Sequence, residues 1–307
     1  MSDFKRYMKW VPLVGLLLFL TGFKVNFTNE DSLKAVKSRV VVEKIGNRFA
    51  TLYFPPGFDR NDNIKVVYML DGNAVFDIDP DFEKLLNRLI NKKIIDPVVV
   101  VGIHSTYNRT SDMLPYFEKE IVDRGSYRPN ARLFSKEIHE VIIPYMEIKY
   151  GVSKNAADRA LFGFSFGGLF TMWEISANQQ QWGMIASSSP SFWVKDYQVY
   201  KDIEEFGVTT DKIWYDIGTG EWNLIYGLVP IFDKLGLEYG VDHFYYEDDG
   251  ARHLYGDLLE RIHNPLIAFA GKQDYNPVGM KVLTEFIPSR RTDRVFKRIN
   301  PMIELAN

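Results

Sequence analysis

Two runs of consecutive apolar residues constrain the fold most. "IKVVYML" (residues 64–70) and "PVVVVGI" (residues 97–103) are continuous and rich in β-branched side chains. Strands that are covered on both faces have this pattern, and they occur in parallel sheets with helices on either side. A strand with one face in water would alternate apolar and polar residues instead. We therefore expect a buried, mostly parallel sheet.

Six further segments complete a set of eight predicted strands. They are residues 39–45, 48–55, 159–163, 183–188, 212–218 and 242–249, of which the first two alternate like a pair of half-exposed strands. Helical stretches separate the later strands. The clearest is residues 131–150, with Leu133, Phe134, Ile138, Val141, Ile142 and Tyr145 at three-and-four spacing and Pro144 as the expected bend. The alternation predicts one α/β domain over residues 39–271, with a mostly parallel eight-stranded sheet flanked by helices.

The N-terminus predicts export. Lys5, Arg6 and Lys9 precede an uncharged apolar run over residues 10–23, which is the pattern of a secretory signal peptide. The run is short for a bilayer span, which needs about 20 residues. No small-residue cleavage site follows it, so residues 1–25 are either a signal peptide or a membrane anchor, with a buried helix as the alternative. We expect a periplasmic or secreted protein with possible membrane attachment through the N-terminus.

Composition excludes several classes of function. A net charge of −3 gives no general affinity for nucleic acid, and the absence of cysteine removes disulfides, zinc–thiolate sites and cysteine catalysis. "DIDPDFE" (residues 77–83) begins like a calcium loop, but Phe82 and Arg88 stand where an EF-hand needs glycine and glutamate. We expect no metal and no cofactor. Residues 26–38 are a predicted linker, and residues 272–307 are a C-terminal extension with no assigned role.

A G-x-S-x-G motif lies between a predicted strand and a predicted helix. In Gly163-Phe164-Ser165-Phe166-Gly167 the serine would occupy a sharp strand-to-helix turn, with its hydroxyl exposed at the end of the sheet. Such a serine has a strained backbone. Glycine is expected on either side of it because a larger side chain would clash there. Ser165 is the predicted nucleophile.

A serine hydroxyl needs a histidine to accept its proton, and in proteins with this turn the acid and the histidine follow the serine. His104 and His139 precede Ser165. His243 lies in a predicted strand and His263 in a predicted helix, where structural histidines are common. His253, on the loop after the last strand, is the predicted base.

Two acidic residues are candidates for the acid that pairs with His253. Glu221 follows the strand over residues 212–218 and is preferred, while Asp216 lies within that strand and is the reserve. A Ser–His dyad with a solvated Glu221 is the third possibility. The oxyanion amides are predicted at Phe166, after the nucleophile, and at Asn73, with Gly72 as a hinge. An ordinary turn is the alternative interpretation of residues 71–73.

Five motifs in this order now resemble one family: "YMLDGN", "GFSFGGLFTMW", "SSSPSFW", "GTGEWN" and "DDGARH". They are similar to the esterase D-like (putative-esterase) branch of the α/β-hydrolases, and within it most of all to the siderophore trilactone esterases. The likeness covers about residues 40–270. It implies a serine esterase with Ser165 as nucleophile, Glu221 as acid, His253 as base, the amides of Asn73 and Phe166 as oxyanion donors, and a small-molecule ester as substrate.

Two further features of the sequence bear on the substrate. "NRTSDMLPY" resembles the family's segment after the fourth strand, which implies Arg109 beside the substrate; an ion pair with Asp112 is the alternative. Trp193 and Trp222 lie on loops at the predicted catalytic edge, where they could stack on an aromatic acyl group or belong to the core. We expect an ester hydrolase for a siderophore trilactone or a similar aromatic ester. The alternatives are a feruloyl or acetyl esterase, an acyltransferase and a non-catalytic ligand-binding protein.

Overall fold

The computed structural model describes residues 37–60, 63–78, 81–125, 127–177, 181–221, 225 and 227–272. The predicted signal peptide or anchor over residues 1–25, nearly all of the predicted linker and all but Lys272 of the C-terminal extension lie outside these residues. Within the described part of the chain, no helix is both long enough and apolar enough to span a bilayer.

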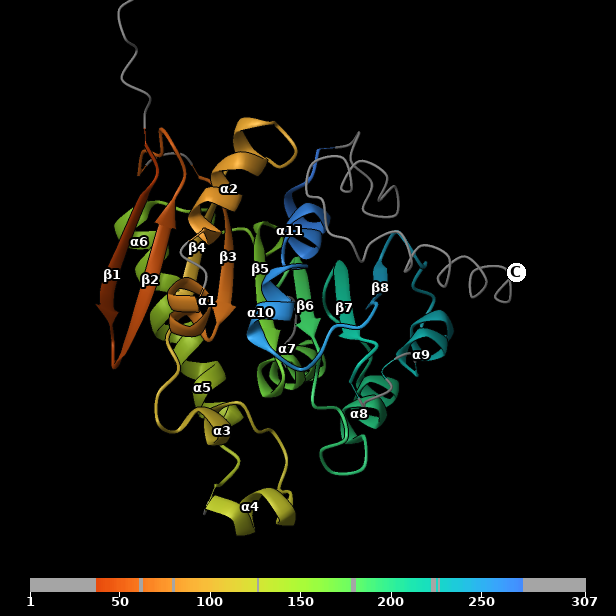
Figure 1. Ribbon diagram of the computed structural model, residues 1–307. Coiled ribbons are helices and arrows are strands. Elements are labelled where there is room, and N and C mark those ends of the chain that lie inside the picture. Colours follow the sequence, from red (N-terminus) through yellow and green to blue (C-terminus); the bar gives the residue numbers. More distant parts are fainter. Residues whose placement is uncertain are drawn as a thin grey trace, which may run out of the picture. The chain divides into compact units, whose positions relative to one another are not determined.

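Eight strands form one mixed sheet in the order β1-β2-β4-β3-β5-β6-β7-β8 (Figure 1). β1 and β2 are antiparallel to each other, β2 is antiparallel to β4, and all other neighbours are parallel. The strands are β1 (Arg39–Ile45), β2 (Arg48–Phe54), β3 (Lys65–Leu70), β4 (Val98–Ile103), β5 (Arg159–Phe164), β6 (Met184–Ser188), β7 (Lys212–Gly218) and β8 (His243–Asp248). The predicted mostly parallel eight-stranded sheet is confirmed.

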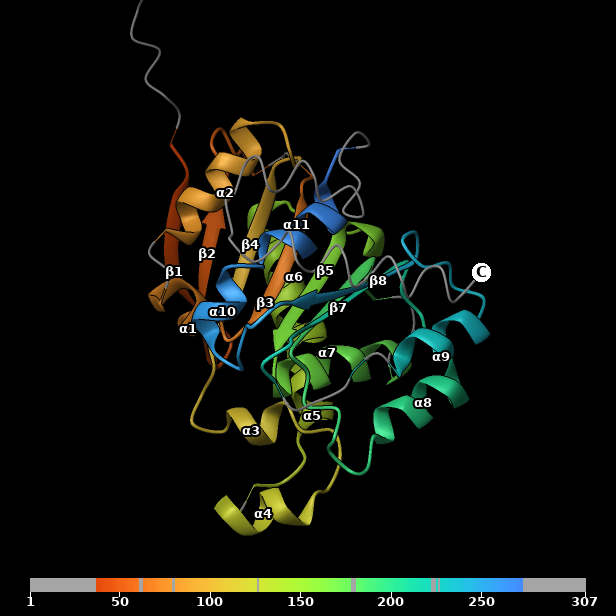
Figure 2. The same ribbon diagram turned by 45° about the vertical axis from the view of Figure 1, so that its right-hand side comes forward.

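Helices cover both faces of this sheet (Figures 1 and 2). One face is packed by α5 (Ala131–Glu137), the π-helical turn η1 (Ile138–Ile142), α6 (Ile143–Tyr150), α7 (Phe166–Ala177), α8 (Gln198–Phe206) and α9 (Leu228–Lys234). The other is packed by α1 (Gly72–Ile78), α2 (Phe82–Asn91), α10 (Tyr255–Leu259) and α11 (His263–Ala270). The short helices α3 (Arg109–Asp112), α4 (Lys119–Gly125) and η2 (Ala156–Asp158) lie in connections.

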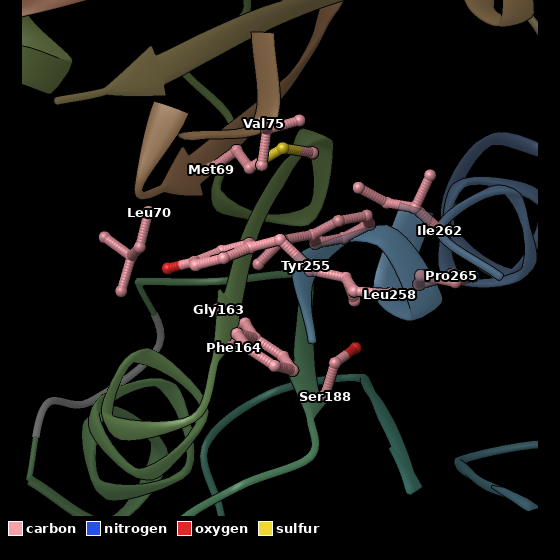
Figure 3. Close-up of a pocket in the computed structure, with 11 residues that line it drawn as sticks. Met69, Leu70, Val75, Gly163, Phe164, Ser188, Tyr255, Leu258, Ile262 and Pro265 are labelled. Atoms are coloured by element: carbon pink, nitrogen blue, oxygen red, sulfur yellow. The ribbon is translucent and has the colours of Figure 1, made fainter. Parts of the chain in front are cut away.

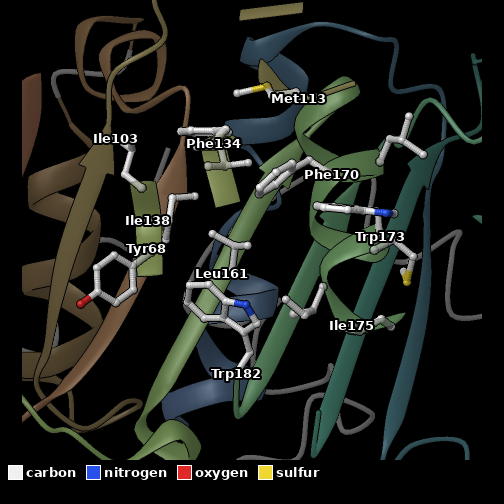
Figure 4. Packing of buried hydrophobic residues seen from close by; sticks show 14 of the residues in the cluster. Tyr68, Ile103, Met113, Phe134, Ile138, Leu161, Phe170, Trp173, Ile175 and Trp182 are labelled. Carbon is white, nitrogen blue, oxygen red and sulfur yellow. The ribbon is translucent and has the colours of Figure 1, made fainter. Parts of the chain in front are cut away.

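The larger core lies under α5 to α9. Figure 4 shows Phe134, Ile138 and Phe170 from the helices meeting Leu161 and Tyr68 from the central strands. The continuous apolar runs identified in the sequence are buried on both faces: every residue of β4 is buried. These residues form strands because helices on either side remove both of their faces from water.

Two expectations about the outer elements are wrong. β2 is almost entirely buried rather than half-exposed, because it pairs with β4 as well as β1 and is therefore an interior strand. The helix expected over residues 131–150 is interrupted by η1, directly before Pro144. Leu133 (65% exposed) lies about 100° around α5 from the buried Phe134, and Val141 (38% exposed) lies within the π-helical turn, so both point to solvent.

The parallel strands bring the predicted site residues to one edge. Asn73 follows β3, Ser165 follows β5, Glu221 follows β7 and His253 follows β8. Because the carboxyl ends of parallel strands lie at the same edge of a sheet, these loops converge there.

Candidate active site

Ser165 occupies a left-handed turn between β5 and α7. Its φ is 61°, and its amide donates to the Ser188 carbonyl at 3.1 Å. A Cβ atom on Gly163 would lie 2.3 Å from the Gly167 carbonyl oxygen, so this position requires glycine. A Cβ on Gly167 would meet its nearest atom, from Leu70, at 3.5 Å, which is ordinary contact. The expectation that both glycines avoid a clash therefore holds for Gly163 alone.

Ser165, His253 and Glu221 form a continuous line of hydrogen bonds. The Ser165 Oγ lies 2.9 Å from His253 Nε2, and His253 Nδ1 lies 2.7 Å from Glu221 Oε2. An ionised carboxylate can only accept, so Nδ1 carries the proton and donates it to Glu221. The neutral imidazole then presents Nε2 as an acceptor to the serine hydroxyl. This tautomer is the one that can remove a proton from Ser165.

Glu221 is held as a carboxylate. Burial alone would raise its pKa, but hydrogen bonds from His253, from the Ser189 hydroxyl (2.5 Å) and from the Gly218 amide (2.8 Å) outweigh burial and lower the pKa below its usual value. Its side chain is only 2% exposed. The interpretation of Glu221 as a solvated loop carboxylate is therefore wrong.

Asp216, the reserve acid, is buried and bonds to other partners than His253. Its carboxylate accepts hydrogen bonds from Arg261 Nε (2.8 Å), the Ser188 hydroxyl (2.8 Å) and the Trp214 indole (2.7 Å). All three of these donors bind Asp216 as a structural residue. Glu221 is the acid that contacts the histidine.

The other histidines have partners elsewhere. His104 contacts Thr51 at 2.8 Å, and His139 contacts Glu174 at 3.0 Å. His243 lies in β8 against the Tyr215 hydroxyl, and His263 is buried at the start of α11. None of these four histidines is hydrogen-bonded to Ser165, so among the five histidines only His253 is positioned to act as its base.

The two predicted oxyanion amides begin helices. Phe166 is the first residue of α7, and Asn73 is the second residue of α1. Neither amide donates a hydrogen bond to another of the described residues, so both remain available to a ligand. The left-handed residue at the start of α1 is Asp71 (φ 56°) rather than the expected hinge Gly72. Gly72 is needed because its Cβ would lie 2.1 Å from the Gly102 carbonyl carbon.

Arg109 has a different partner from the one expected. Its Nε and Nη2 donate to the two oxygens of Asp71, each at 2.6 Å, whereas Asp112 pairs with Arg48 at 2.9 Å. Burial would lower the pKa of Arg109, but the hydrogen bonds and charge of Asp71 raise it above its usual value. The Tyr255 hydroxyl also donates to Asp71, at 2.7 Å. The predicted ion pair with Asp112 is wrong, and the predicted contact of Arg109 with substrate stays a prediction.

Two hollows open onto the nucleophile, and both are bordered by Ser165 and His253. The residues that line the first are Asn73, Ala74, Ser105, Arg109, Phe164, Leu254 and Tyr255. The second is lined by Phe166, Ser191, Trp193, Gly220 and Glu221. Trp193 is 36% exposed and its ring centroid lies 6.2 Å from that of Phe166, so an aromatic wall is available to a ligand. Trp222 lies outside the described residues.

Phe164 supports the histidine from below. Its ring stacks on His253 with centroids 4.7 Å apart and contacts Tyr255 at 4.8 Å. Behind this pair lies a small apolar cavity of about 20 Å³, room for about one water molecule. Figure 3 shows Met69, Phe164 and Tyr255 around it. The two phenylalanines of the motif thus differ: Phe164 packs under the base and Phe166 borders the second hollow.

Several hydrogen-bond partners around the site were not predicted from the sequence. Asp71 and Tyr255 form the network around Arg109, and Ser189 and Arg261 lie behind Glu221. Asp71 and Ser189 belong to motifs that were noted, "YMLDGN" and "SSSPSFW", but their partners are distant in the chain. Among the described residues, no group of three or more histidine, aspartate or glutamate side chains is arranged to hold a metal.

A strand–turn–helix serine with this histidine and acid defines an α/β-hydrolase of the serine hydrolase type. The chain belongs to the Putative esterase family, whose profile matches residues 45–226. It is 26% identical over 188 residues to the uncharacterized protein YbbA of Bacillus subtilis, covering 61% of this chain and 74% of YbbA. It is 28% identical over 155 residues to the siderophore enterobactin esterase of Emericella nidulans, covering 46% of this chain and 50% of that esterase.

Solved structures share the fold. The BES protein from Bacillus cereus has a TM-score of 0.60 at 20% identity, covering 77% of this chain and 95% of that chain. The siderophore hydrolase EstB from Aspergillus nidulans has a TM-score of 0.58 at 18% identity, covering 76% and 94%. The predicted family and fold are confirmed, with siderophore esterases among the distant relatives.

Proposed function

We propose that this protein is a serine carboxylester hydrolase that acts through an acyl-Ser165 intermediate. The observation that carries the proposal is the unbroken hydrogen-bond line from Ser165 through His253 to Glu221. Its polarity is that of a base ready to accept the hydroxyl proton. A purely binding protein would have no need of a strained serine aligned with a histidine that is hydrogen-bonded to a buried carboxylate.

The first half-reaction transfers the acyl group to the enzyme. His253 Nε2 removes the Ser165 proton as Oγ attacks the ester carbonyl carbon, and the amides of Asn73 and Phe166 stabilise the negative oxygen. Collapse of this intermediate breaks the bond to the alkoxide, which takes the proton from His253 and leaves. Glu221 stabilises the imidazolium in between.

The second half-reaction releases the acid. Water gives a proton to His253 Nε2 and attacks the acyl carbon, and the intermediate collapses with return of that proton to Ser165. Because Phe164 stacks on the imidazole ring, the ring keeps its orientation through both half-reactions.

We propose an aromatic acyl ester as substrate, with a siderophore trilactone as the first candidate. Trp193 and Phe166 supply an aromatic wall beside the nucleophile, on which a catecholate ring can stack. The name of the Emericella nidulans relative, an enterobactin esterase, supports the same class of substrate.

The test compares the full chain with Ser165→Ala. Each is incubated with a catecholate trilactone, and cleavage to linear fragments is followed by mass spectrometry. We expect hydrolysis by the parent chain and none by the variant. If the parent leaves the trilactone intact but cleaves feruloyl or acetyl aryl esters, the substrate proposal fails and the hydrolase proposal stands. An added alcohol acceptor that takes the acyl group in place of water would indicate an acyltransferase. Inertness toward every ester and toward a fluorophosphonate serine probe would favour a binding protein.

We also propose export of the chain, on the basis of the basic residues and apolar run at its N-terminus. Fractionation of cells that express the full chain tests this. Recovery in the cytoplasmic fraction alone would contradict it.

A further inference from the structure

A buried arginine lies behind the acid of the site. Arg261 comes from the segment between α10 and α11, and its side chain is 2% exposed. Its guanidinium lies among three carboxylates: Asp216 at 2.8 Å, Asp248 at 3.5 Å and Glu221 at 3.8 Å. A buried cation is costly unless it is paired, and this one is fixed by its contact with Asp216. The triad itself makes no direct hydrogen bond to it.

One hydroxyl connects this arginine to the acid. Ser189 follows β6 and is fully buried; Arg261 Nη2 lies 2.6 Å from its Oγ, and Glu221 Oε1 lies 2.5 Å from the same atom. Arginine can only donate, so Ser189 must accept from Arg261. The Ser189 hydroxyl therefore donates its one proton to Glu221, and the hydrogen bonds run from Arg261 through Ser189 to Glu221.

The backbone holds Ser189 in this place. Its φ is 43°, in the left-handed region that non-glycine residues rarely adopt, and its amide donates to the Asp216 carbonyl at 2.7 Å. Such a conformation persists only where the surroundings hold it. Ser189 is thus fixed at both its backbone and its hydroxyl.

As a consequence, the two carboxylate oxygens of Glu221 have different partners. Oε1 is occupied by Ser189 and by the Gly218 amide, which leaves Oε2 to His253. Without the Ser189 hydroxyl, Arg261 Nη2 would lose the acceptor that separates it from Glu221. A direct ion pair would then draw the carboxylate toward Arg261 and away from His253.

We propose that Ser189 and Arg261 are positioning residues, which hold the Glu221 carboxylate against His253 without touching the substrate. This inference rests on the proposed function. Loss of the Ser189 hydroxyl should lower kcat by about tenfold to a hundredfold, the rate equivalent of one hydrogen bond to a charged group. KM should stay within about twofold, because Ser189 lines neither hollow.

A double-mutant cycle of Ser189→Ala and Glu221→Ala tests the proposal on the full chain. The substrate is 4-nitrophenyl acetate, whose leaving group departs without protonation, so that weak variants remain measurable. A residue that acts through Glu221 has no effect once Glu221 is gone. We therefore expect the loss of kcat from Ser189→Ala in the parent and no further loss in the Glu221→Ala background. Equal losses in both backgrounds, or no loss in the parent, would overturn the inference.

Two further variants separate positioning from folding. Ser153 is also buried and donates to a carboxylate, Asp158 at 2.7 Å, but it lies before β5, away from Ser165. Ser153→Ala is the matched control and should leave kcat within about twofold. Ser189→Gly suits the left-handed backbone and also lacks the hydroxyl, so it should reproduce the loss of kcat even if Ser189→Ala folds poorly. A parent chain that cleaves no ester would refute the proposed function and this inference together, whereas an active parent with an additive cycle would refute this inference alone.

Discussion

Glu221→Gln is the substitution that distinguishes a triad from a dyad most sharply. The amide keeps the size of the side chain but loses its charge, and its NH₂ group can donate to His253 Nδ1. The histidine would then carry its proton on Nε2 and could not accept one from Ser165. The glutamine also cannot stabilise the imidazolium that forms during the reaction.

The expected loss of kcat follows from the distance between His253 and Glu221. With Nδ1 2.7 Å from Oε2, the charge centres of the imidazolium and the carboxylate lie about 4 Å apart, worth about 4 kcal/mol at an effective dielectric constant of about 20. Screening reduces this value, because the His253 side chain is 41% exposed. We expect kcat to fall by about 100-fold to 1,000-fold, with KM nearly unchanged.

The assay is steady-state hydrolysis of an aryl ester, with the rate of fluorophosphonate labelling of Ser165 as a second measure. Glu147→Gln is the control: Glu147 is ion-paired with Arg159 at 2.9 Å, at the opposite end of β5 from Ser165. It should keep kcat within about twofold. A loss of less than about tenfold in Glu221→Gln would refute the reasoning and favour a Ser–His dyad.

Three other outcomes are expected. Gly163→Ala should lower the melting temperature by about 5 °C or more, because its Cβ would lie 2.3 Å from a carbonyl oxygen, while Gly167→Ala should leave it unchanged or higher. Scanning calorimetry measures both, and equal effects would contradict the steric argument. Burial lowers the pKa of His263 from 6.5 to about 4. Between pH 6.5 and about pH 4 the unfolded chain therefore binds a proton that the folded chain does not, and the free energy of unfolding falls as the pH drops through this range. His263→Gln should flatten that part of a plot of stability against pH. An unchanged slope would argue against a neutral buried His263. Trp193→Ala should raise KM for bulky aromatic esters at least threefold more than KM for an acetate, by about the worth of one aromatic contact, and parallel changes would remove Trp193 from the binding surface.

The sheet and the arrangement of Ser165, His253 and Glu221 were predictable because both follow from the order of residues along the chain. A continuous apolar run such as residues 97–103 has one stable environment, and the ends of parallel strands must converge. His253 could be selected because the other histidines lie before Ser165 or within regular elements. The contacts with Ser165 and Glu221 then follow from the edge that these loops share.

The ion pairs were not predictable in this way. Asp112 lies three residues after Arg109, yet it pairs with Arg48 from β2, and Arg109 pairs with Asp71 from the end of β3. Spacing along the chain favours ion pairs between residues that are close in sequence. In the folded protein, burial and geometry decide which charged residues pair. The exposure of Val141 was not predicted because it lies in the π-helical turn, which leaves no clear period in the sequence.

The junction of the two hollows at Ser165 and His253 has a consequence for cyclic esters. Cleavage of an open-chain ester yields separate acid and alcohol parts, which diffuse apart. Opening one bond of a ring leaves the new hydroxyl tethered to the acyl-enzyme, at an effective concentration of about millimolar for a short flexible tether. That hydroxyl competes with water and can close the ring again. If the substrate is a cyclic ester, as proposed, ring opening becomes permanent once the freed end has moved away from His253, and the hollow lined by Trp193 offers one direction for that movement.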